Sequence, residues 1–318
     1  MNKIISTYLE KKFQNKKVLI IGLGREGLST YKFLKKYLPQ QRIDTTDEKP
    51  LEKLSPEFQE LFHKLKQDSF HNFREASDLE NSDFVFLSPG VPESKYSKII
   101  NHTSQITSNT QLFFDITGKL RSAGSEITTI GVTGTKGKST TTALIHHVLK
   151  ENGFDAYLGG NIGIPPLDLL SSPLIKEETP DANQAEVFFV LELSSHQLVT
   201  LKTSPDIAVI QTIKEEHLDH FESFEKYISA KANITKYQSK KDLLVYFEKN
   251  KIVKKIAEKS KAEKIAFSKN NFIKLEETKL KGQHSVVNIT PSVIIAKKLG
   301  ISDDQIKKSI KTFKGLPH

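Results

Sequence analysis

A glycine-rich loop lies between an apolar strand and a helix in the stretch GVTGTKGKSTTT, residues 131–142. The apolar run ITTIGVTG leads into the loop, and STTTALIHHVLKENG follows it with helical periodicity and ends at Gly153. Such a loop directs backbone N–H groups and the positive end of a helix dipole toward one point. The pattern therefore favours a bound phosphate over the alternative, a glycine-rich turn that binds nothing.

The loop differs in spacing from the usual phosphate-binding pattern, G-x-x-x-x-G-K-[ST]. Gly137, Lys138 and Ser139 match its end, but Val132 occupies the position of its first glycine. Because strand, turn and helix keep their order, we still expect Lys138 to reach the β- and γ-phosphates of a nucleotide and Ser139 to bind Mg²⁺. Two side chains of the loop are expected to flank the γ-phosphate, namely Thr135 and Lys136.

A bound triphosphate requires a metal ion, and three later segments offer candidate ligands. Glu192 ends the apolar strand VFFVLEL, where α/β sheets present ligands, although a carboxylate there is otherwise a solvated strand end. His217 lies in IKEEHLDHF, and the choice of ligand within this cluster is open, because other metal-binding side chains surround it: Glu215, Glu216, Asp219 and His220. Lys231 lies on the amphipathic helix KYISAKANI and, taken alone, is typical of a surface lysine.

A second glycine-rich turn, GLGREG, lies near the N-terminus and follows the buried strand KVLIIGLG. Its glycines are Gly22, Gly24 and Gly27, and Asp47 ends the next strand 20 residues after the last of them. This spacing is typical of a dinucleotide fingerprint. It supports a pyrophosphate site but does not distinguish NAD from another nucleotide diphosphate.

Short apolar runs alternate with helical patterns along the chain, which predicts an α/β protein with parallel strands. We expect a looser stretch at residues 109–125 between two units, a domain boundary there, and a surface insertion at residues 171–184. The strands are expected in runs of β-branched and aromatic residues: KVLIIGLG, RIDTTD, DFVFLSPG, ITTIGVTG, EVFFVLEL, DIAVIQTI and DLLVYF.

Composition narrows the class of protein. The 318 residues include no cysteine, which excludes disulfides, thiolate metal sites and a cysteine nucleophile. We find no signal peptide and no apolar run long enough for a membrane span, so the cytoplasm is the expected location. The net charge of +9 admits a nucleic-acid partner, but we favour solvated helix faces such as KNKIVKKIAEKSKAEK and expect no nucleic acid. The four arginines are far apart: Arg25, Arg42, Arg74 and Arg121.

Taken together, these stretches resemble the ATP-dependent Mur ligases of peptidoglycan synthesis. The resemblance covers nearly the whole chain in the family's order, and it is carried by IGLGREG, SPGV, GVTGTKGKSTTT, GGNIG, LELSSHQL, EEHLDHF, ISAKANI, LKGQHSVVN and GLPH. It implies a Rossmann-like domain at residues 1–115 that binds a UDP-linked substrate, followed by a P-loop-type central ATPase domain at residues 116–313. Residues 314–318 would begin a third, ligase domain that is absent from this sequence.

The resemblance also implies roles for individual residues. The phosphates of ATP would be held by Gly134, Thr135, Lys136, Gly137, Lys138, Ser139 and Thr140, with Asn288 at the adenine. Two Mg²⁺ ions and the chemistry would be served by Lys138, Ser139, Glu192, His217 and Lys231, the last carrying a carbamate. The muramoyl substrate would contact Asn161, Ser194 and Gln197. Its UDP portion would be held by Gly22, Gly24, Gly27, Asp47, Ser88 and Gly90. Thr212 departs from the family pattern, which usually has asparagine there.

Within the family the chain is most similar to the members that add D-glutamate to UDP-N-acetylmuramoyl-L-alanine through an acyl phosphate. These small-molecule substrates, and a monomer, are the partners that the resemblance implies. A chain that ends at GLPH would lack the amino-acid acceptor site and is expected to show little ligase activity alone. Three alternatives remain open: a non-catalytic nucleotide-binding remnant, a sister ligase for another amino acid, and a dehydrogenase based on GLGREG and Asp47.

Overall fold

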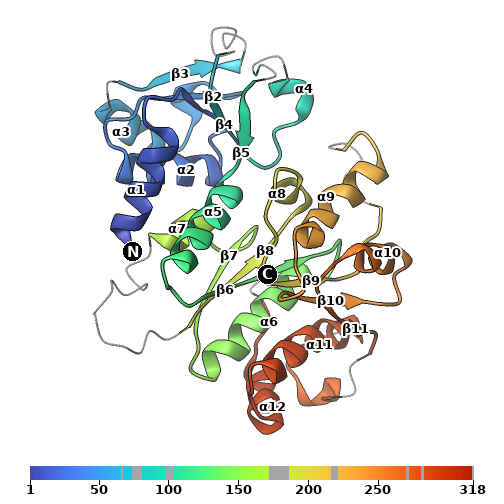
Figure 1. Cartoon of the computed structure of the whole chain (residues 1–318). Helices are drawn as coiled ribbons and strands as arrows, with labels where there is room; N and C mark the ends of the chain where they lie inside the picture. The colour runs from blue at the N-terminus through green and yellow to red at the C-terminus, as the bar shows by residue number, and fades with distance from the viewer. Residues whose placement is uncertain are drawn as a thin grey trace. The chain divides into compact units, whose positions relative to one another are not determined.

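The computed structural model describes residues 1–65, 67–73, 81–97, 100, 103–171, 186–215, 221–269, 272–280 and 283–316. The chain forms two compact units (Figure 1). The first runs from Met1 to Ala123 and includes a later segment that begins at Pro165, whereas the second begins at Gly124 and resumes after that segment. Each unit is built on a sheet of parallel strands with helices, which confirms the predicted α/β fold class.

The first unit contains a five-stranded sheet in the order β3-β2-β1-β4-β5. Its strands are β1 (Val18–Ile21), β2 (Ile43–Asp47), β3 (Ser69–Asn72), β4 (Phe84–Leu87) and β5 (Gln105–Thr107). Its helices are α1 (Asn2–Phe13), α2 (Arg25–Tyr37), η1 (Leu51–Lys53), α3 (Pro56–Lys64), α4 (Glu93–Tyr96), α5 (Asn109–Ser122) and α7 (Pro166–Leu170). The strand order reverses between β1 and β4, and ligands of such sheets bind at that switch point.

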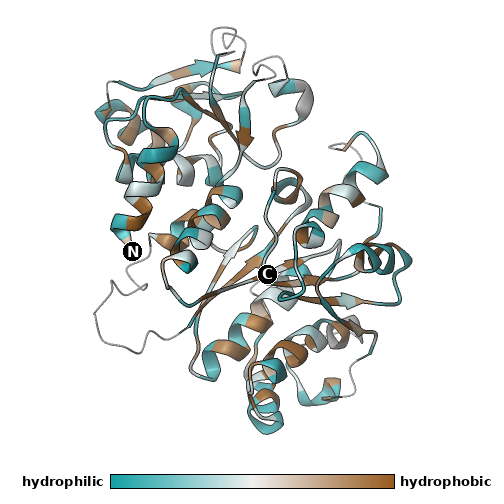
Figure 2. Ribbon diagram, in the orientation of Figure 1, coloured by the Kyte–Doolittle hydropathy of each residue, from teal (hydrophilic) through white to brown (hydrophobic). Residues whose placement is uncertain are grey.

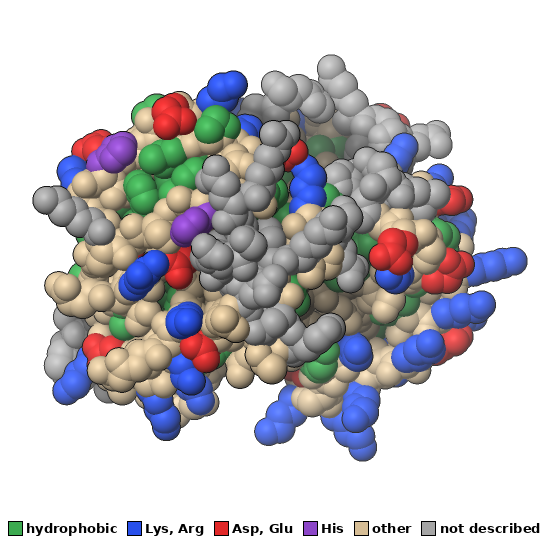
Figure 3. Space-filling model, turned by 90° about the horizontal axis from the view of Figure 1, so that it is seen from above, with side chains coloured by type: hydrophobic (Ala, Val, Ile, Leu, Met, Phe, Trp, Pro, Cys, Tyr) green, Lys and Arg blue, Asp and Glu red, His purple; other side chains and the backbone are tan. Residues whose placement is uncertain are grey.

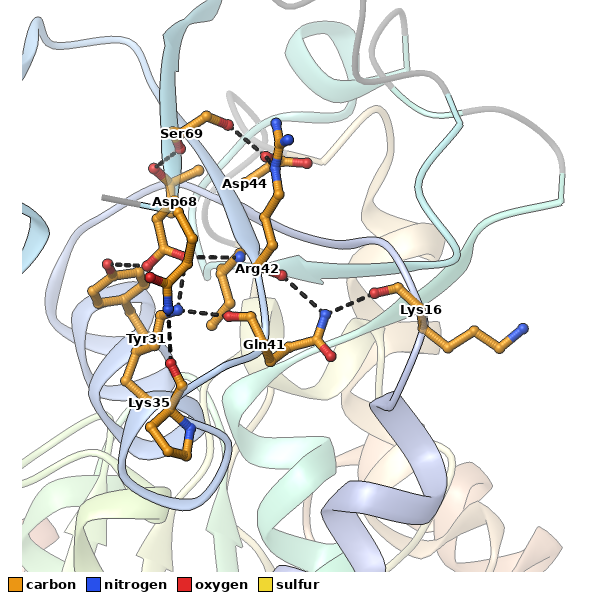
Figure 4. A network of polar contacts seen from close by, with 12 residues as sticks. Lys16, Tyr31, Lys35, Gln41, Arg42, Asp44, Asp68 and Ser69 are labelled. Atoms are coloured by element: carbon orange, nitrogen blue, oxygen red, sulfur yellow. Dashed lines mark hydrogen bonds and ion pairs between the residues drawn. The ribbon is translucent and has the colours of Figure 1, made fainter. Parts of the chain in front are cut away.

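A buried ion pair joins Lys35 on α2 to Asp68, the residue before β3, in this unit (Figure 4). Asp68 Oδ1 accepts hydrogen bonds from Lys35 Nζ at 2.6 Å and from the Ile43 amide at 3.0 Å, and its Oδ2 accepts one from the Tyr31 hydroxyl. Burial, together with the bond to Asp68, raises the pKa of the Tyr31 phenol, so this hydroxyl remains a donor. Lys35 Nζ also bonds to the Gln41 carbonyl oxygen, and the charges on both partners are therefore compensated inside the unit.

Replacing Lys35 with methionine is expected to lower the free energy of unfolding by about 3–5 kcal/mol, because it leaves the Asp68 carboxylate buried without a countercharge. Lys32→Met is the matched control, since Lys32 lies on the same helix and binds Glu57 at the same 2.6 Å but on the surface. We expect the control to change stability by less than about 1 kcal/mol. Urea unfolding of both variants checks this, and equal losses would contradict it.

The second unit contains a six-stranded sheet in the order β11-β10-β9-β6-β8-β7. Its strands are β6 (Ile127–Thr133), β7 (Asp155–Gly160), β8 (Val187–Glu192), β9 (Ile207–Ile210), β10 (Leu243–Phe247) and β11 (Glu263–Phe267). Its helices are α6 (Lys138–Glu151), α8 (Ser195–Val199), α9 (Phe224–Lys236), α10 (Lys251–Lys259), η3 (Leu275–Glu277), α11 (Gln283–Lys298) and α12 (Asp303–Thr312).

The core of the second unit lies between this sheet and the layer formed by α6, α11 and α12. The central strands β8 and β9 consist mostly of apolar residues, which are brown in Figure 2, whereas β6 combines apolar residues with threonine and glycine. Alternate residues of β6, such as Ile130 and Val132, face α6, whose Leu144 and Val148 are fully buried. A sheet covered in this way holds the carboxyl ends of its strands fixed relative to one another.

The structure differs from the sequence-based expectation at the junction of the units. Residues 109–122 form the regular helix α5, which packs with the first unit, rather than a looser stretch, and the expected boundary after residue 115 falls inside it. Ser108 caps α5 by accepting a hydrogen bond from the Gln111 amide. The helix is buried on several sides, so it lacks the polar face that reveals a surface helix in a sequence. The expected insertion at residues 171–184 lies almost wholly outside the described residues.

The surface carries charges of both signs. On the face shown in Figure 3, acidic side chains (red) are interspersed with Lys and Arg side chains (blue). Helix α10 illustrates the pattern, because Val253, Ile256 and Ala257 are buried while its lysines line the other face. The solvated face of α10 therefore contributes to the net positive charge. In the part of the chain that the structure describes, we find no helix with the length and apolar character needed to cross a bilayer.

Candidate nucleotide site

The phosphate-loop candidate lies at the carboxyl end of β6, in the middle of the second sheet. Gly137 is the N-cap of α6 and adopts a left-handed φ of +84°, which glycine tolerates best. The first amide groups of α6 have no partner within the helix and point toward the loop. Lys138 Nζ folds back over the loop and donates to the Thr135 carbonyl oxygen at 3.0 Å. The strand, turn and helix predicted from the sequence are thus confirmed.

Glu192 lies next to this loop because β8 pairs with β6, where Val132 and Glu192 are in register. Its side chain is 1% exposed. Oε1 accepts a hydrogen bond at 2.7 Å from the Asn161 side-chain amide, which follows β7 on the other side. Oε2 has no hydrogen-bond partner among the described residues. A buried carboxylate oxygen without a partner is costly, and a bound hard cation removes that cost.

Lys231 reaches the loop from α9 and is 2% exposed, so it is not the surface lysine that its sequence context suggests. Its Nζ donates to the Gly134 carbonyl oxygen at 2.9 Å and lies 4.8 Å from the ring centre of Tyr227. His217, the other predicted ligand, lies outside the described residues. The segment that leads to it from β9 contacts the loop, since the Thr135 amide donates to the Thr212 carbonyl oxygen at 2.7 Å.

Asn288 lies on α11 and is in contact with the loop. A Cβ placed on Gly137 would come within 2.3 Å of the Asn288 side-chain oxygen, so the two residues are adjacent. The main chain at this point of α11 is tied to α6, because the Thr141 hydroxyl donates to the Asn288 carbonyl oxygen at 3.3 Å. Gln211, at the end of β9, donates to that hydroxyl at 2.7 Å. Helix α11 thus places Asn288 beside the phosphate loop.

Ser194 and Gln197 lie just after Glu192 and bind each other. The Ser194 hydroxyl accepts from the Gln197 amide, and the Gln197 side chain accepts from the Ser194 amide, which forms a capping box for α8. Their expected contact with a substrate stays a prediction. Two loop residues, Ser139 and Thr140, lie in the first turn of α6 and are partly exposed, and Lys136 is exposed. Their expected contacts with a nucleotide stay predictions.

The glycine-rich turn of the first unit lies at the switch point of its sheet. Asp47 Oδ2 accepts from the Leu23 amide at 2.6 Å, and Oδ1 accepts from the Lys49 amide at 2.9 Å. The Ser88 hydroxyl donates to the Gly22 carbonyl oxygen at 2.6 Å. A Cβ on Gly27 would overlap that same carbonyl oxygen, which requires glycine at that position. Residues predicted from three separate stretches, the glycine-rich turn, Asp47 and Ser88, are therefore close together, and Asp47 stabilises the turn through a hydrogen bond to its main chain.

Comparison with known proteins identifies the family. The model of the Mur ligase middle domain matches residues 132–306. A UDP-N-acetylmuramoylalanine--D-glutamate ligase of Acetivibrio thermocellus is 31% identical over 97% of this chain and 67% of the relative. The chain belongs to the Mur ligase family. The enzyme of the same name from Clostridium kluyveri is 32% identical over 95% of this chain and 66% of its own length. The chain therefore spans about two thirds of the length of these curated Mur ligases.

Solved Mur ligase structures share the fold at lower sequence identity. A UDP-N-acetylmuramate:L-alanyl-gamma-D-glutamyl-meso-diaminopimelate ligase from Neisseria meningitides has a TM-score of 0.61 and 15% identity over 95% of this chain and 99% of that one. A MurF ligase from Thermotoga maritima, solved in complex with ADP, has a TM-score of 0.51 and 18% identity over 97% of this chain and 66% of its own. Mur ligases are ATP-binding enzymes of peptidoglycan synthesis, as the sequence resemblance implied.

The position of Asp47 leads to a prediction about the first unit of this Mur ligase. Asp47→Asn retains the shape of the side chain but has one acceptor oxygen instead of two, so either the Leu23 or the Lys49 amide loses its partner. We expect the affinity for a UDP-linked substrate to fall about 10-fold, the equivalent of one charge-assisted hydrogen bond. Isothermal titration with UDP-N-acetylmuramoyl-L-alanine measures this.

Asp44→Asn is the control for that experiment, because Asp44 lies three residues earlier on β2 and binds Ser69 and Arg42 away from the turn. It is expected to bind the substrate as the wild type does. An unchanged dissociation constant for Asp47→Asn, with both proteins folded, would show that the turn does not hold the substrate.

Proposed function

We propose that this chain provides the substrate- and ATP-binding parts of a ligase that adds D-glutamate to UDP-N-acetylmuramoyl-L-alanine. The observation that carries the proposal lies at the carboxyl edge of the second sheet, where the glycine-rich loop adjoins both Glu192, whose Oε2 has no hydrogen-bond partner among the described residues, and the Lys231 amine. The proposal is supported by the names of the curated relatives, which are ligases of this specificity. The substrates, Mg²⁺ and the carbamate belong to the proposal.

The donor set fits Mg²⁺. The Glu192 Oε2 atom has no hydrogen-bond partner among the described residues, and Mg²⁺ prefers oxygen ligands of this kind. We propose that Glu192 and Ser139 hold one ion, and that His217 and Lys231 serve a second. Lys231 becomes an oxygen ligand when its neutral amine adds CO₂ and releases a proton, which gives a carbamate. Bound magnesium would supply charge neutralisation for the transferring phosphoryl group.

The residues of the chain then position the reactants. Lys138 releases the Thr135 carbonyl and bonds to the γ-phosphate, while the amides at the start of α6 bind the phosphate oxygens. A carboxylate oxygen of the substrate L-alanine attacks the γ-phosphorus, the bond to the β-γ bridging oxygen breaks, and ADP leaves. The D-glutamate amine then attacks the acyl carbon and loses a proton to solvent, and the tetrahedral intermediate collapses as the bond from the acyl carbon to the phosphate oxygen breaks, which gives the amide and inorganic phosphate.

The first unit is proposed to hold the UDP portion of the substrate. Asp47 accepts a hydrogen bond from a main-chain amide with each of its oxygens, at Leu23 and Lys49, and so holds the glycine-rich turn in place. Gly22, Ser88 and Gly90 adjoin the turn, and the positive φ of +87° at Gly90 fits a close approach of main chain to ligand.

Two measurements on the 318-residue chain test the proposal. Titration calorimetry is expected to show binding of MgATP and, independently, of UDP-N-acetylmuramoyl-L-alanine. A panel of amino acids is then added with both, and amide formation is followed by mass spectrometry; D-glutamate is the acceptor expected to give more product than any other. Binding of NAD without binding of ATP would refute the ligase proposal, and product with another amino acid would reassign its specificity.

A further inference from the structure

The hydroxyl of Thr135 lies inside the protein and contacts two other elements. It donates to the Lys214 carbonyl oxygen at 3.1 Å, accepts from the Lys214 amide at 2.9 Å, and lies 3.1 Å from the Tyr227 hydroxyl. A threonine hydroxyl has one proton and two acceptor lone pairs. Because the Lys214 carbonyl takes the proton, Tyr227 must donate its own. The capacity of the Thr135 hydroxyl is then complete, and its amide is bound to Thr212, so neither group is free for a phosphate.

These contacts lead to the residues that bear the proposed chemistry. Lys214 is three residues before His217, on the segment that leaves β9. Tyr227 is four residues before Lys231 on α9, so the two side chains share one face of the helix. That face holds the loop twice, because Tyr227 binds the Thr135 side chain while Lys231 binds the neighbouring Gly134 carbonyl.

We propose that Thr135 and Tyr227 are positioning residues that fix the phosphate loop relative to Lys231. The inference rests on the proposed function, in which Lys231 acts at the bound nucleotide. In this arrangement the Lys231 amine lies over the Tyr227 ring, and the Tyr227 hydroxyl sets the distance from α9 to the loop. The segment after Thr212 is aligned through the same threonine. Loss of either hydroxyl would leave the loop intact but out of register with the other two elements.

A general contribution to folding does not account for this arrangement. Thr129, in the amino-terminal half of β6, is fully buried, and its hydroxyl donates to Asp206 Oδ2. That bond stabilises the sheet far from the loop. Thr135 instead joins two segments that the sheet does not hold in register, since Lys214 lies beyond β9 and Tyr227 lies on a helix. The comparison provides a control variant with the same chemistry and a different position.

The test measures MgATP affinity by titration calorimetry and thermal stability on the same samples of the 318-residue chain. Thr135→Val keeps the shape and removes the hydroxyl, and it is expected to weaken MgATP binding about 10- to 100-fold, because several buried partners are left unpaired. Tyr227→Phe keeps the ring and is expected to weaken binding about 3- to 10-fold. Thr135→Ser restores the hydroxyl and is expected to stay within about 3-fold of the wild type.

Two controls and a double variant separate positioning from stability. Thr129→Val and Tyr157→Phe each remove a hydroxyl hydrogen bond on the same sheet, and they are expected to lower the melting temperature without changing MgATP affinity. The double variant Thr135→Val, Tyr227→Phe is expected to bind like Thr135→Val alone, because the two hydroxyls form one contact. If Thr135→Val does not fold, Tyr227→Phe and Thr135→Ser still decide the question.

Wild-type affinity in folded Thr135→Val or Tyr227→Phe would overturn the inference, as would fully additive losses in the double variant. These results would leave the proposed function intact, because the wild-type chain would still bind MgATP. A wild-type chain that binds no MgATP would overturn the proposed function and, with it, this inference.

Discussion

Replacing Glu192 with glutamine is expected to reduce the Mg²⁺ dependence of ATP binding and to weaken MgATP binding about 100-fold, since the loss of even an outer partner of a metal site costs 10- to 100-fold. The amide retains an oxygen for the hydrogen bond from Asn161, so the local structure is preserved. What disappears is the charged oxygen that has no partner among the described residues. A carbonyl or amide nitrogen is a far weaker ligand for this ion than a carboxylate.

The same substitution is expected to leave the melting temperature of the ligand-free chain at or above the wild-type value. A carboxylate in this position costs free energy in the absence of a cation, because its burial removes water from a polar atom without replacing it. MgATP affinity is therefore lost while thermal stability is retained, whereas a substitution that disrupts the hydrophobic core would lower the stability. Calorimetric titrations of ATP with and without Mg²⁺, alongside thermal unfolding, measure both quantities.

Glu263→Gln serves as the control for Glu192→Gln, since Glu263 lies on β11 and pairs with Lys298 at the surface. It is expected to change neither ATP binding nor its Mg²⁺ dependence. If Glu192→Gln keeps the full wild-type difference in ATP affinity between solutions with and without Mg²⁺, Glu192 is not a metal ligand.

Replacing Gly137 with alanine is expected to weaken MgATP binding about 100-fold, the effect of displacing a binding group by an ångström or so. The added Cβ would lie 2.3 Å from the Asn288 side-chain oxygen, which must move away. That oxygen is at the end of a flexible side chain, so the helix pair survives while Asn288 leaves its place beside the loop. The left-handed φ of +84° adds about 1–2 kcal/mol of strain to the folded state.

Gly153→Ala separates the backbone strain of a positive φ from the steric clash of the added Cβ with Asn288. Gly153 follows the other end of α6 with a φ of +83°, and a Cβ there meets nothing within 4 Å. Both variants should therefore lose similar stability in urea unfolding, and only Gly137→Ala should lose affinity for MgATP. Similar affinities in the two variants would mean that the Asn288 contact with Gly137 has no part in nucleotide binding.

Much of this site could be predicted from sequence because its parts lie at strand ends. Glycine-rich turns, an apolar run and a terminal Glu192 are local signals, and parallel strands bring their carboxyl ends to one edge of a sheet. The order of motifs along the chain then identified the family, and the structure confirms the α/β fold with two parallel sheets.

The rest depended on packing that no local signal encodes. The sequence around Lys231 is typical of a surface helix. The residue is buried only because α9 packs against β6, which no local sequence signal encodes. Thr135 was expected at the γ-phosphate, but its hydroxyl and amide are bound to residues 77 to 92 positions away along the chain. Helix α5 went unrecognised because it is covered on several sides, which removes the polar stripe. The structure does not describe His217, so its role stays a prediction.

The segment that contains α7 affects how this chain can fold while the ribosome synthesises it. Its Leu167 amide binds the Asn109 side chain, and Asp168 accepts from the Ser29 hydroxyl, so the first unit is incomplete without it. On the ribosome, these bonds must wait until β6, α6 and β7 of the second unit have already emerged. The two units therefore cannot mature strictly one after the other, and a protein ending at Ala123 would expose the faces of α2 and α5 that α7 covers.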